Sequence, residues 1–459
     1  MVWSRFVDFL LGRKPRPQVG PSLEVRRPVG PRPATSRLPR FKGEASDLER
    51  SLRGRDTPVD QQRARLQLAF TPSQPVSDVR MFAGRRELLL SLIRAIEEQQ
   101  LHAVIFGDRG IGKTSLLHVF SQLAREARYI VRYTSCTETS EFDSTFRAIA
   151  ADVPLLYHAD FDPTSEPAER GTALDSLLPS DRTLTVATMT EVFAKLSGTR
   201  VLIILDEFDR AVSPEFKRSV AELIKNLSDR SIRVQIVIAG VAANLTELVE
   251  HIPSIRRNIL GLPVPMMTQE EVSEMISLGE AAGQLSFAEG AVQAIVDAAQ
   301  GSPYVTGLLA QHAAARALDR QVREVEESDV AEAIRRAMRD VWVRLSPLSQ
   351  QQVEAVEAKL SPAAFGALAG EALSHFGLVM PAGAGAESLA EPVRVAIDTG
   401  ILREARLGER SGHQFADDSV ALYLWLASRL GTRDATAEST TAGEAGHAPA
   451  NVPNQENWK

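Results

Sequence analysis

The chain has 459 residues, 44% of them hydrophobic and 24% charged, and a formal net charge of −7. This composition is typical of a globular protein with two or three domains, and the negative balance argues against a protein that wraps nucleic acid over its whole surface. The single cysteine, Cys136, excludes an intrachain disulfide and a cysteine-cluster metal site, so we expect a reducing, cytoplasmic setting.

Residues 1–75 form a predicted disordered arm that is basic and rich in proline. Residues 1–40 hold nine Lys or Arg, two acidic residues and seven prolines, and such a segment buries too little apolar surface to offset the entropy lost on ordering. No apolar stretch of the chain approaches the roughly 20 residues of a membrane-spanning helix. Trp3, Phe6 and Leu10 fit one helix face, which leaves a weak membrane or partner anchor and a frayed terminus as alternatives.

Residues 76–265 alternate short apolar segments with segments of helical periodicity. The short segments are apolar and rich in β-branched residues, as buried strands are. We expect five such strands, at 101–107, 129–136, 200–207, 233–240 and 258–264. Strands that alternate with helices predict a parallel sheet covered on both faces, which is an α/β fold.

The strands stop after residue 265, and residues 266–340 predict a helical lid over the sheet. Two pairs in this stretch have the spacing of capping boxes, which begin helices. These pairs are Thr268 with Glu271 and Ser286 with Glu289.

Residues 341–432 combine helical segments with a predicted β-hairpin that turns near 408–412, and an apolar helix follows. Helices followed by a hairpin indicate a winged-helix-like α+β domain. Residues 433–459 are polar and are expected to form a disordered tail.

The run FGDRGIGKTS, residues 106–115, joins the first predicted strand to a helix. Its glycines let the backbone turn tightly and aim N–H groups at an anion. Lys113 is placed to reach the β- and γ-phosphates of a nucleotide, and the Thr114 hydroxyl to hold Mg²⁺, while the helix directs its positive end at the phosphates. The alternative is an ordinary strand–turn–helix connection. The loop residues predicted to bind ATP are Gly107, Asp108, Arg109, Gly110, Ile111, Gly112, Lys113, Thr114 and Ser115.

Two acids end the third predicted strand, at the ligand-binding edge of an open α/β sheet. Asp206 is predicted to bind Mg²⁺ through water, and Glu207 to polarise the attacking water as a general base. Together with Lys113 as a catalytic cation they predict ATP hydrolysis; the alternative is a solvated acidic strand end. For Asp209 a role in the site and a role as a helix cap both remain open.

Each of the polar side chains near the fourth and fifth strands has two alternative roles. Arg256 and Arg257 are candidates for an arginine finger that reaches the nucleotide of a neighbouring subunit, or for cations favoured at a helix C-terminus. Asn244 is either a sensor of the γ-phosphate or a residue of a turn or N-cap.

The set FAGRREL, GDRGIGKTS, LIILDEFDR, GVAANLTELVEHIPSIRRN and GSPY resembles the AAA+ ATPases related to origin-recognition proteins, and the neighbouring signal-transduction ATPases grouped as STAND. The resemblance covers about residues 76–338. It implies a P-loop NTPase sheet with a helical lid, and it implies that Phe82, Gly84 and Arg85 lie beside the adenine.

One departure separates the two groups. Origin-recognition relatives carry an arginine early in the third lid helix as a second sensor, whereas this chain has GSPYVTGLL without an arginine. The Gly-x-Pro of Gly301 and Pro303 resembles that of STAND proteins, in which the proline packs near the base. This departure favours a slow switch over replication-type remodelling.

The function predicted from these motifs is an ATP-hydrolysing molecular switch that couples nucleotide state to homo-oligomer assembly or partner binding. The alternative is a nucleotide-gated DNA-binding protein that acts through the C-terminal domain, where Arg403, Arg406 and Arg410 fall in the hairpin. Residues 341–435 contain eight basic and eleven acidic residues, and this balance favours a protein partner over DNA.

Overall fold

The computed structural model describes residues 58–430 except for 73, 77, 163, 165–170, 243, 250–256, 375–376, 381–385 and 408–409. Most of the predicted N-terminal arm and the predicted C-terminal tail lie outside the described residues.

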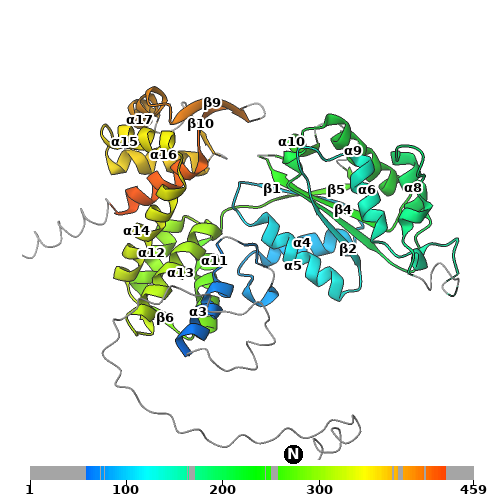
Figure 1. Ribbon diagram of the computed structural model, residues 1–459, viewed down its shortest axis with the longest axis horizontal. Helices are drawn as coiled ribbons and strands as arrows, with labels where there is room; N and C mark the ends of the chain where they lie inside the picture. Colours follow the sequence, from blue (N-terminus) through cyan, green and yellow to red (C-terminus); the bar gives the residue numbers. More distant parts are fainter. Residues whose placement is uncertain are drawn as a thin grey trace, which may run out of the picture. The chain divides into compact units, whose positions relative to one another are not determined.

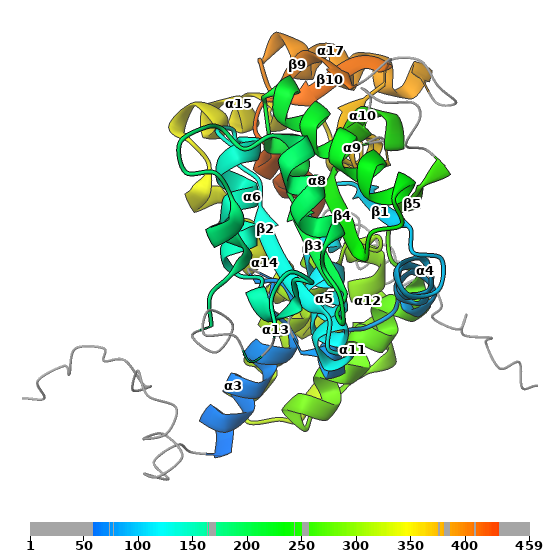
Figure 2. The ribbon, with the colours of Figure 1, turned by 90° about the vertical axis from the view of Figure 1, so that its right-hand side faces the viewer.

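A five-stranded parallel sheet forms the centre of the N-terminal half. Its strands are β1 (His102–Gly107), β2 (Ile130–Ser135), β3 (Val201–Asp206), β4 (Val234–Val241) and β5 (Ile259–Pro263). The order across the sheet is β2-β3-β4-β1-β5 and all its pairs are parallel, as Figure 2 shows from left to right. The five strands predicted from the sequence are confirmed. Because parallel strands point the same way, the loops after β1, β3 and β4 gather at one edge.

Helices cover both faces of this sheet (Figure 1). They are α4 (Arg86–Glu97) and α5 (Lys113–Glu126) on one face, and α6 (Phe142–Ala151), α8 (Val186–Ala194), α9 (Pro214–Asp229) and α10 (Leu245–Val249) on the other. Alternate residues of a strand face opposite sides. On β3, Leu202 and Ile204 therefore join the core beneath α4 and α5, while Ile203 and Leu205 join the core beneath the other helices.

The predicted lid consists of four long helices and a short two-stranded sheet. The helices are α11 (Gln269–Gly283), α12 (Glu289–Ala299), α13 (Pro303–Asp319) and α14 (Glu327–Arg344), and the strands are β6 (Ser286–Phe287) and β7 (Glu324–Val325). The capping box of Thr268 and Glu271 is present at α11. The second predicted box is wrong: Ser286 pairs with Glu324 in the small sheet, and Ala288 is the N-cap of α12.

A helix within the predicted arm packs against the lid. It is α3 (Pro58–Ala69), which contacts α11 and α13. Phe70 directly after it is fully buried in the lid core, and a β-carbon on Gly279 of α11 would lie 1.9 Å from the Phe70 ring. The predicted arm, residues 1–75, is therefore too long at its C-terminal end, because Leu66 and Phe70 are buried in the lid core and hold this stretch in place.

The C-terminal region combines helices with a three-stranded antiparallel sheet. Its elements are α15 (Pro347–Glu357), α16 (Pro362–Ser374), β8 (Leu378–Val379), α17 (Ala386–Asp398), β9 (Leu402–Leu407) and β10 (Arg410–Phe415), followed by a helix over 418–430. The strand order is β8-β10-β9, so the predicted hairpin is present. One hydrophobic core runs from Leu66 to Leu426 through α3, the lid and this region, and the indole Nε1 of Trp425 donates to the Ala298 carbonyl of α12 at 2.7 Å.

Candidate functional site

The loop between β1 and α5 has a backbone that depends on glycine. Gly107, Gly110 and Gly112 adopt φ angles of +152°, +73° and +95°, which residues with a β-carbon rarely adopt. A β-carbon on Gly107 would also lie 2.7 Å from the Val264 carbonyl oxygen. Gly112 is the N-cap of α5 and has no side chain to cap it, so the first N–H groups of the helix are left to bind an anion.

Lys113 begins α5 and folds back on this loop. Its Nζ donates to the carbonyl oxygens of Gly107 at 2.9 Å and Asp108 at 2.7 Å. Burial lowers the pKa of Lys113, and the carboxylates of Asp209, Asp108 and Asp206 oppose that shift. Burial also raises the pKa of Asp108 to about 6. The ammonium group therefore lies among acids and carbonyls at the base of the loop.

The predicted magnesium residues lie together. Asp206, at the end of β3, is 2% exposed, and its Oδ2 accepts a hydrogen bond from Thr114 Oγ1 at 2.8 Å. The Tyr133 hydroxyl of β2 donates to the same Oδ2 at 2.5 Å, and the backbone N–H of Glu207 donates to Oδ1 at 2.8 Å. A carboxylate and a hydroxyl are the oxygen ligands that Mg²⁺ prefers, so this pair fits the predicted role.

Tyr133 was not identified from the sequence. Burial and its hydrogen bond to Asp206 raise the pKa of Tyr133, so the phenol keeps its proton at neutral pH. The His118 ring of α5 packs edge-on against it, with ring centroids 5.0 Å apart. Only the strand order, which makes β2 the neighbour of β3, brings this tyrosine to the site.

Glu207 follows Asp206 in the chain, but its side chain pairs with Arg210 and not with the predicted magnesium residues. It adopts a left-handed backbone with φ +53°, and its carboxylate forms an ion pair with Arg210 at 2.9 Å. Asp209 accepts a hydrogen bond from the Val241 backbone N–H at 2.8 Å. Asp209 therefore ties the turn after β3 to the end of β4, a role different from the predicted helix cap.

The remaining predicted residues after β4 are partly described. The Asn244 Oδ1 accepts from the Glu247 backbone N–H at 3.2 Å and its Nδ2 donates to the Glu247 carboxylate at 3.0 Å, which is the predicted N-cap arrangement. Arg256 lies outside the described residues. Arg257 is exposed in the turn that leads into β5.

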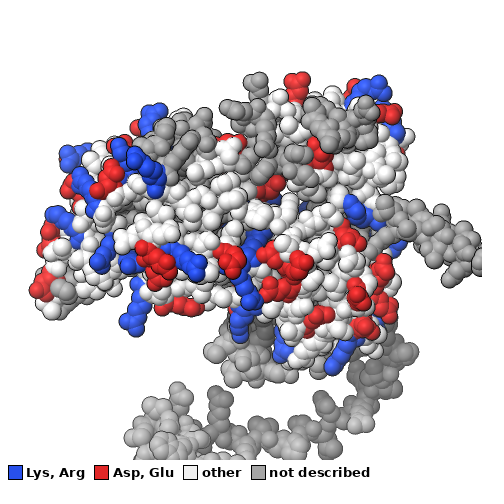
Figure 3. All heavy atoms as spheres, turned by 180° about the vertical axis from the view of Figure 1, so that it is seen from behind, with Lys and Arg blue, Asp and Glu red and all other residues white. Residues whose placement is uncertain are grey.

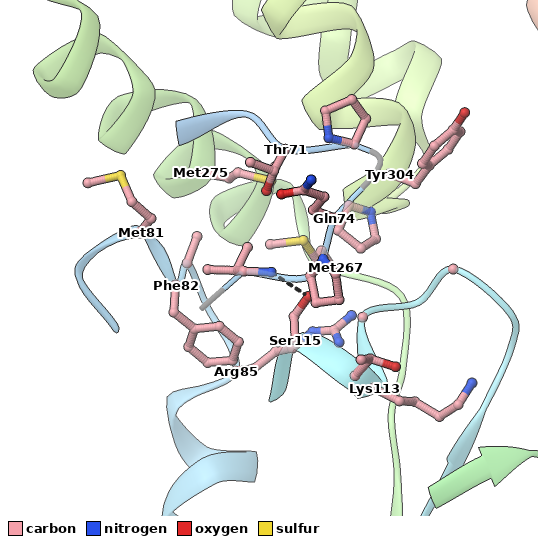
Figure 4. A pocket seen from close by; sticks show the side chains of 18 residues that line it. Thr71, Gln74, Met81, Phe82, Arg85, Lys113, Ser115, Met267, Met275 and Tyr304 are labelled. Atoms are coloured by element: carbon pink, nitrogen blue, oxygen red, sulfur yellow. Dashed lines mark hydrogen bonds between the residues drawn. The ribbon is translucent and has the colours of Figure 1, made fainter. Parts of the chain in front are cut away.

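A cavity of about 300 Å³ opens beside the loop (Figure 4). Its walls come from the segment before α4, the loop after β1 and the lid. The predicted residues among its lining are Phe82, Arg85, Gly110, Gly112, Lys113, Thr114, Ser115 and Pro303. In Figure 4 the Lys113 side chain points away from the part of the cavity between Phe82 and Met275. The other lining residues were not assigned to the site from the sequence, because they fall outside the phosphate-binding and acidic motifs. Among them are Thr71, Pro72, Gln74, Pro75, Val76, Met267, Met275 and Tyr304.

Carboxylates of the lid bind the N-terminus of α4 at the edge of this cavity. Glu271 Oε1 accepts from the Arg85 backbone N–H at 2.6 Å, and Glu274 Oε2 accepts from the Gly84 N–H at 2.9 Å. The other Glu274 oxygen forms an ion pair with Arg86 at 2.7 Å. We call these contacts the lid latch. Gly84 is predicted to lie beside the adenine, but it does not line the cavity and contacts the lid.

The Arg85 side chain lies in the cavity wall. Its Nη2 donates to the Pro265 carbonyl at 3.1 Å, and its Nη1 lies 3.2 Å from the position of a β-carbon on Gly112. Burial lowers the pKa of Arg85 to about 10, so the guanidinium stays charged at neutral pH. It places a cation beside the glycine-rich loop.

A parallel sheet with a glycine-rich loop, a lysine and a threonine at a helix start, and a buried aspartate at the end of a second strand, β3, define a P-loop NTPase. In the sheet order, β4 lies between β3 and β1. The family model described as Novel STAND NTPase 1 matches residues 70–364, more than half of the chain. The protein therefore belongs to this family. The match confirms the predicted assignment to STAND-related P-loop NTPases.

The chain is also similar to several solved structures. The Thermotoga maritima RuvB Holliday junction branch migration motor is 15% identical, with a TM-score of 0.40 over 77% of this chain and 97% of that chain. The Aeropyrum pernix ORC1 protein in complex with DNA is 15% identical, with a TM-score of 0.41 over 81% and 98%. The Aeropyrum pernix ORC2 protein is 14% identical, with a TM-score of 0.42 over 80% and 98%. A search of the curated proteins finds no match.

Within the part of the chain that the structure describes, no helix has the length and apolar character needed to cross a membrane. The same residues contain no group of three or more His, Cys, Asp or Glu that could hold a metal ion.

Proposed function

We propose that the protein binds MgATP between its sheet and its lid and acts as a slow, ATP-hydrolysing switch. The observation that carries this proposal is the contact of Thr114 with Asp206 beside Lys113, at the mouth of a cavity that the lid completes. Each of these groups has a task in holding a nucleotide, and they come from separate parts of the sequence.

Each residue of the loop has a defined part in this proposal. The N–H groups between Gly107 and Ser115 bind the phosphates, and Lys113 exchanges its two loop carbonyls for phosphate oxygens. Thr114 and Asp206 hold Mg²⁺, which neutralises charge on the β- and γ-phosphates when bound. Phe82, Arg85 and Pro303 line the remainder of the cavity, where the base is expected.

Hydrolysis requires a base and a further cation. Glu207 is the proposed base, and it must leave its ion pair with Arg210 to polarise a water molecule. Arg257, exposed before β5, and Arg256 are proposed as fingers that reach the nucleotide of a second copy in a homo-oligomer.

The output of the switch is proposed to be a movement of the lid. The lid, α3 and the C-terminal region share one hydrophobic core, and close-packed cores move as units. A change in the lid latch would therefore displace α3 and the C-terminal region together. A partner protein that binds α3 or the C-terminal region would then bind differently in the two nucleotide states.

Nucleotide binding and phosphate release test the proposal directly. Calorimetry with ATP and Mg²⁺ should show binding to the wild-type protein and a large loss of affinity in Lys113→Ala. Glu207→Gln should keep the affinity but lose most of the phosphate release. Equal release by the wild-type protein and both variants would refute hydrolysis, and an absence of binding to the intact protein would refute the whole function.

A nucleotide-gated DNA-binding function is the second candidate. It is favoured by the observed hairpin of β9 and β10, where Arg403 is exposed. Against it, the face in Figure 3 shows Lys and Arg interspersed with Asp and Glu over its described part. A gel shift that weakens steeply with salt would support DNA, whereas binding indifferent to salt would favour a protein partner.

The proposed membrane contact of the first eleven residues stays a prediction, tested by vesicle co-sedimentation with and without residues 1–40.

A further inference from the structure

We propose that Tyr133 is a positioning residue that holds Asp206 in the orientation required for Mg²⁺. This role rests on the proposed binding of MgATP. The sequence motifs do not include Tyr133, because it belongs to β2 and not to the loop or to the acidic strand end.

Asp206 uses both carboxylate oxygens in fixed hydrogen bonds. Oδ1 accepts from the Glu207 backbone N–H, and Oδ2 accepts from the hydroxyls of Thr114 and Tyr133. Of these two hydroxyls, Thr114 is itself a proposed magnesium ligand. Tyr133 is then the side-chain donor that fixes Oδ2 without taking part in coordination. Hydrogen bonds of this kind, one step removed from a metal, orient the ligand and tune its affinity.

The Tyr133 ring is held from two sides. Its strand pairs with β3 so that Tyr133 lies opposite Ile204, and the ring packs against the core beneath α4 and α5. The His118 ring lies edge-on against it, one helical turn after Thr114 on the same face of α5. The packing of the ring therefore fixes the position of the Tyr133 hydroxyl beside Asp206.

The variant Tyr133→Phe removes the hydroxyl and keeps the ring. Because the change acts on the carboxylate that is predicted to hold Mg²⁺ through water, it should alter only the part of nucleotide binding that depends on Mg²⁺. We expect the affinity for a fluorescent ATP analogue in EDTA to equal that of the wild-type protein. The Mg²⁺ concentration for half-maximal tightening should rise by about tenfold, as when other such partners of metal ligands are removed.

The matched control is Tyr129→Phe. Tyr129 precedes the same strand, and its hydroxyl oxygen accepts a hydrogen bond from Arg200 Nη1 at 2.9 Å, away from Asp206. This variant should leave the Mg²⁺ dependence unchanged. Thermal unfolding without nucleotide will show whether both variants are equally folded.

A double-variant test keeps the proposal falsifiable even if Tyr133→Phe lowers stability. In an Asp206→Asn background, Tyr133→Phe should cause no further change in the Mg²⁺ dependence, because the two groups act as one unit. An additive effect in that background would overturn the proposal, as would an unchanged Mg²⁺ dependence in Tyr133→Phe or an equal loss of affinity with and without Mg²⁺. A wild-type protein without nucleotide affinity would instead overturn the proposed function and this role with it.

Discussion

The lid latch offers a direct test of the coupling between nucleotide and lid. In Glu274→Ala, the Gly84 N–H loses its carboxylate partner and Arg86 loses its ion pair. A hydrogen bond to a charged group contributes about 1.5–3 kcal/mol. The Arg86 side chain is 82% exposed, so its ion pair adds less than about 1 kcal/mol. The latch at Glu274 is therefore expected to contribute about 2 kcal/mol to the contact between lid and α4.

If MgATP binds the latched form, this energy appears in its affinity. At 1.4 kcal/mol for each factor of ten, the dissociation constant should rise by about 30-fold. Calorimetric titration with MgATP measures the change. The control is Glu270→Ala, which removes the same charge one turn earlier on α11, where the exposed carboxylate interacts with its own backbone and Thr268. If both variants bind MgATP within twofold of one another, the latch does not couple the lid to the nucleotide.

Three further outcomes follow from the structure. Phe70→Ala should lower the free energy of unfolding by about 3–5 kcal/mol, because Phe70 is fully buried, whereas Leu68→Ala, at a side chain that is 73% exposed, should be near neutral in the same urea titration. Arg210→Ala should raise the rate of phosphate release several-fold by freeing Glu207; a fall in that rate would contradict the assigned pairing. Burial lowers the pKa of His102 to about 4 in the folded protein. Between about pH 6.5 and about pH 4 the imidazole therefore takes up a proton in the unfolded state but not in the folded state. The contribution of His102 to the free energy of unfolding should be complete above about pH 6.5 and should decline as the pH falls toward about 4. The difference in unfolding free energy between the wild-type protein and His102→Gln, followed over that range, checks the sign.

The sheet and the loop could be predicted because the interactions that determine them involve residues close together in the sequence. The strands are short apolar runs, and the glycines after β1 are required by positive φ angles within the loop itself. The contact of Thr114 with Asp206 followed from the rule that parallel strands end at one edge. Such features depend on residues close in sequence or on the direction of the strands.

The missed features depend on partners distant in sequence. Tyr133 meets Asp206 only because β2 and β3 are neighbours, and no motif records that order. The helix α3 has a weak apolar periodicity of its own and is stabilised by the lid, more than two hundred residues away. Ser286 has the spacing of a capping box, yet its pairing with Glu324 moves the start of α12 to Glu289. Tertiary contacts decided each case.

The site combines features that favour a switch over a fast motor. Glu207 must break its ion pair with Arg210 before it can act as a base, and α13 begins with Pro303 where a second-sensor arginine is expected in origin-recognition relatives. The lid is bound to α4 by Glu271 and Glu274, so its release in the proposed cycle would cost energy that nucleotide contacts would have to supply. Because the lid shares its core with α3 and the C-terminal region, the proposed release would move these elements together. In the proposed switch, few turnovers would then be enough to report a change of state, and an assay of partner binding should respond to bound nucleotide rather than to the hydrolysis rate.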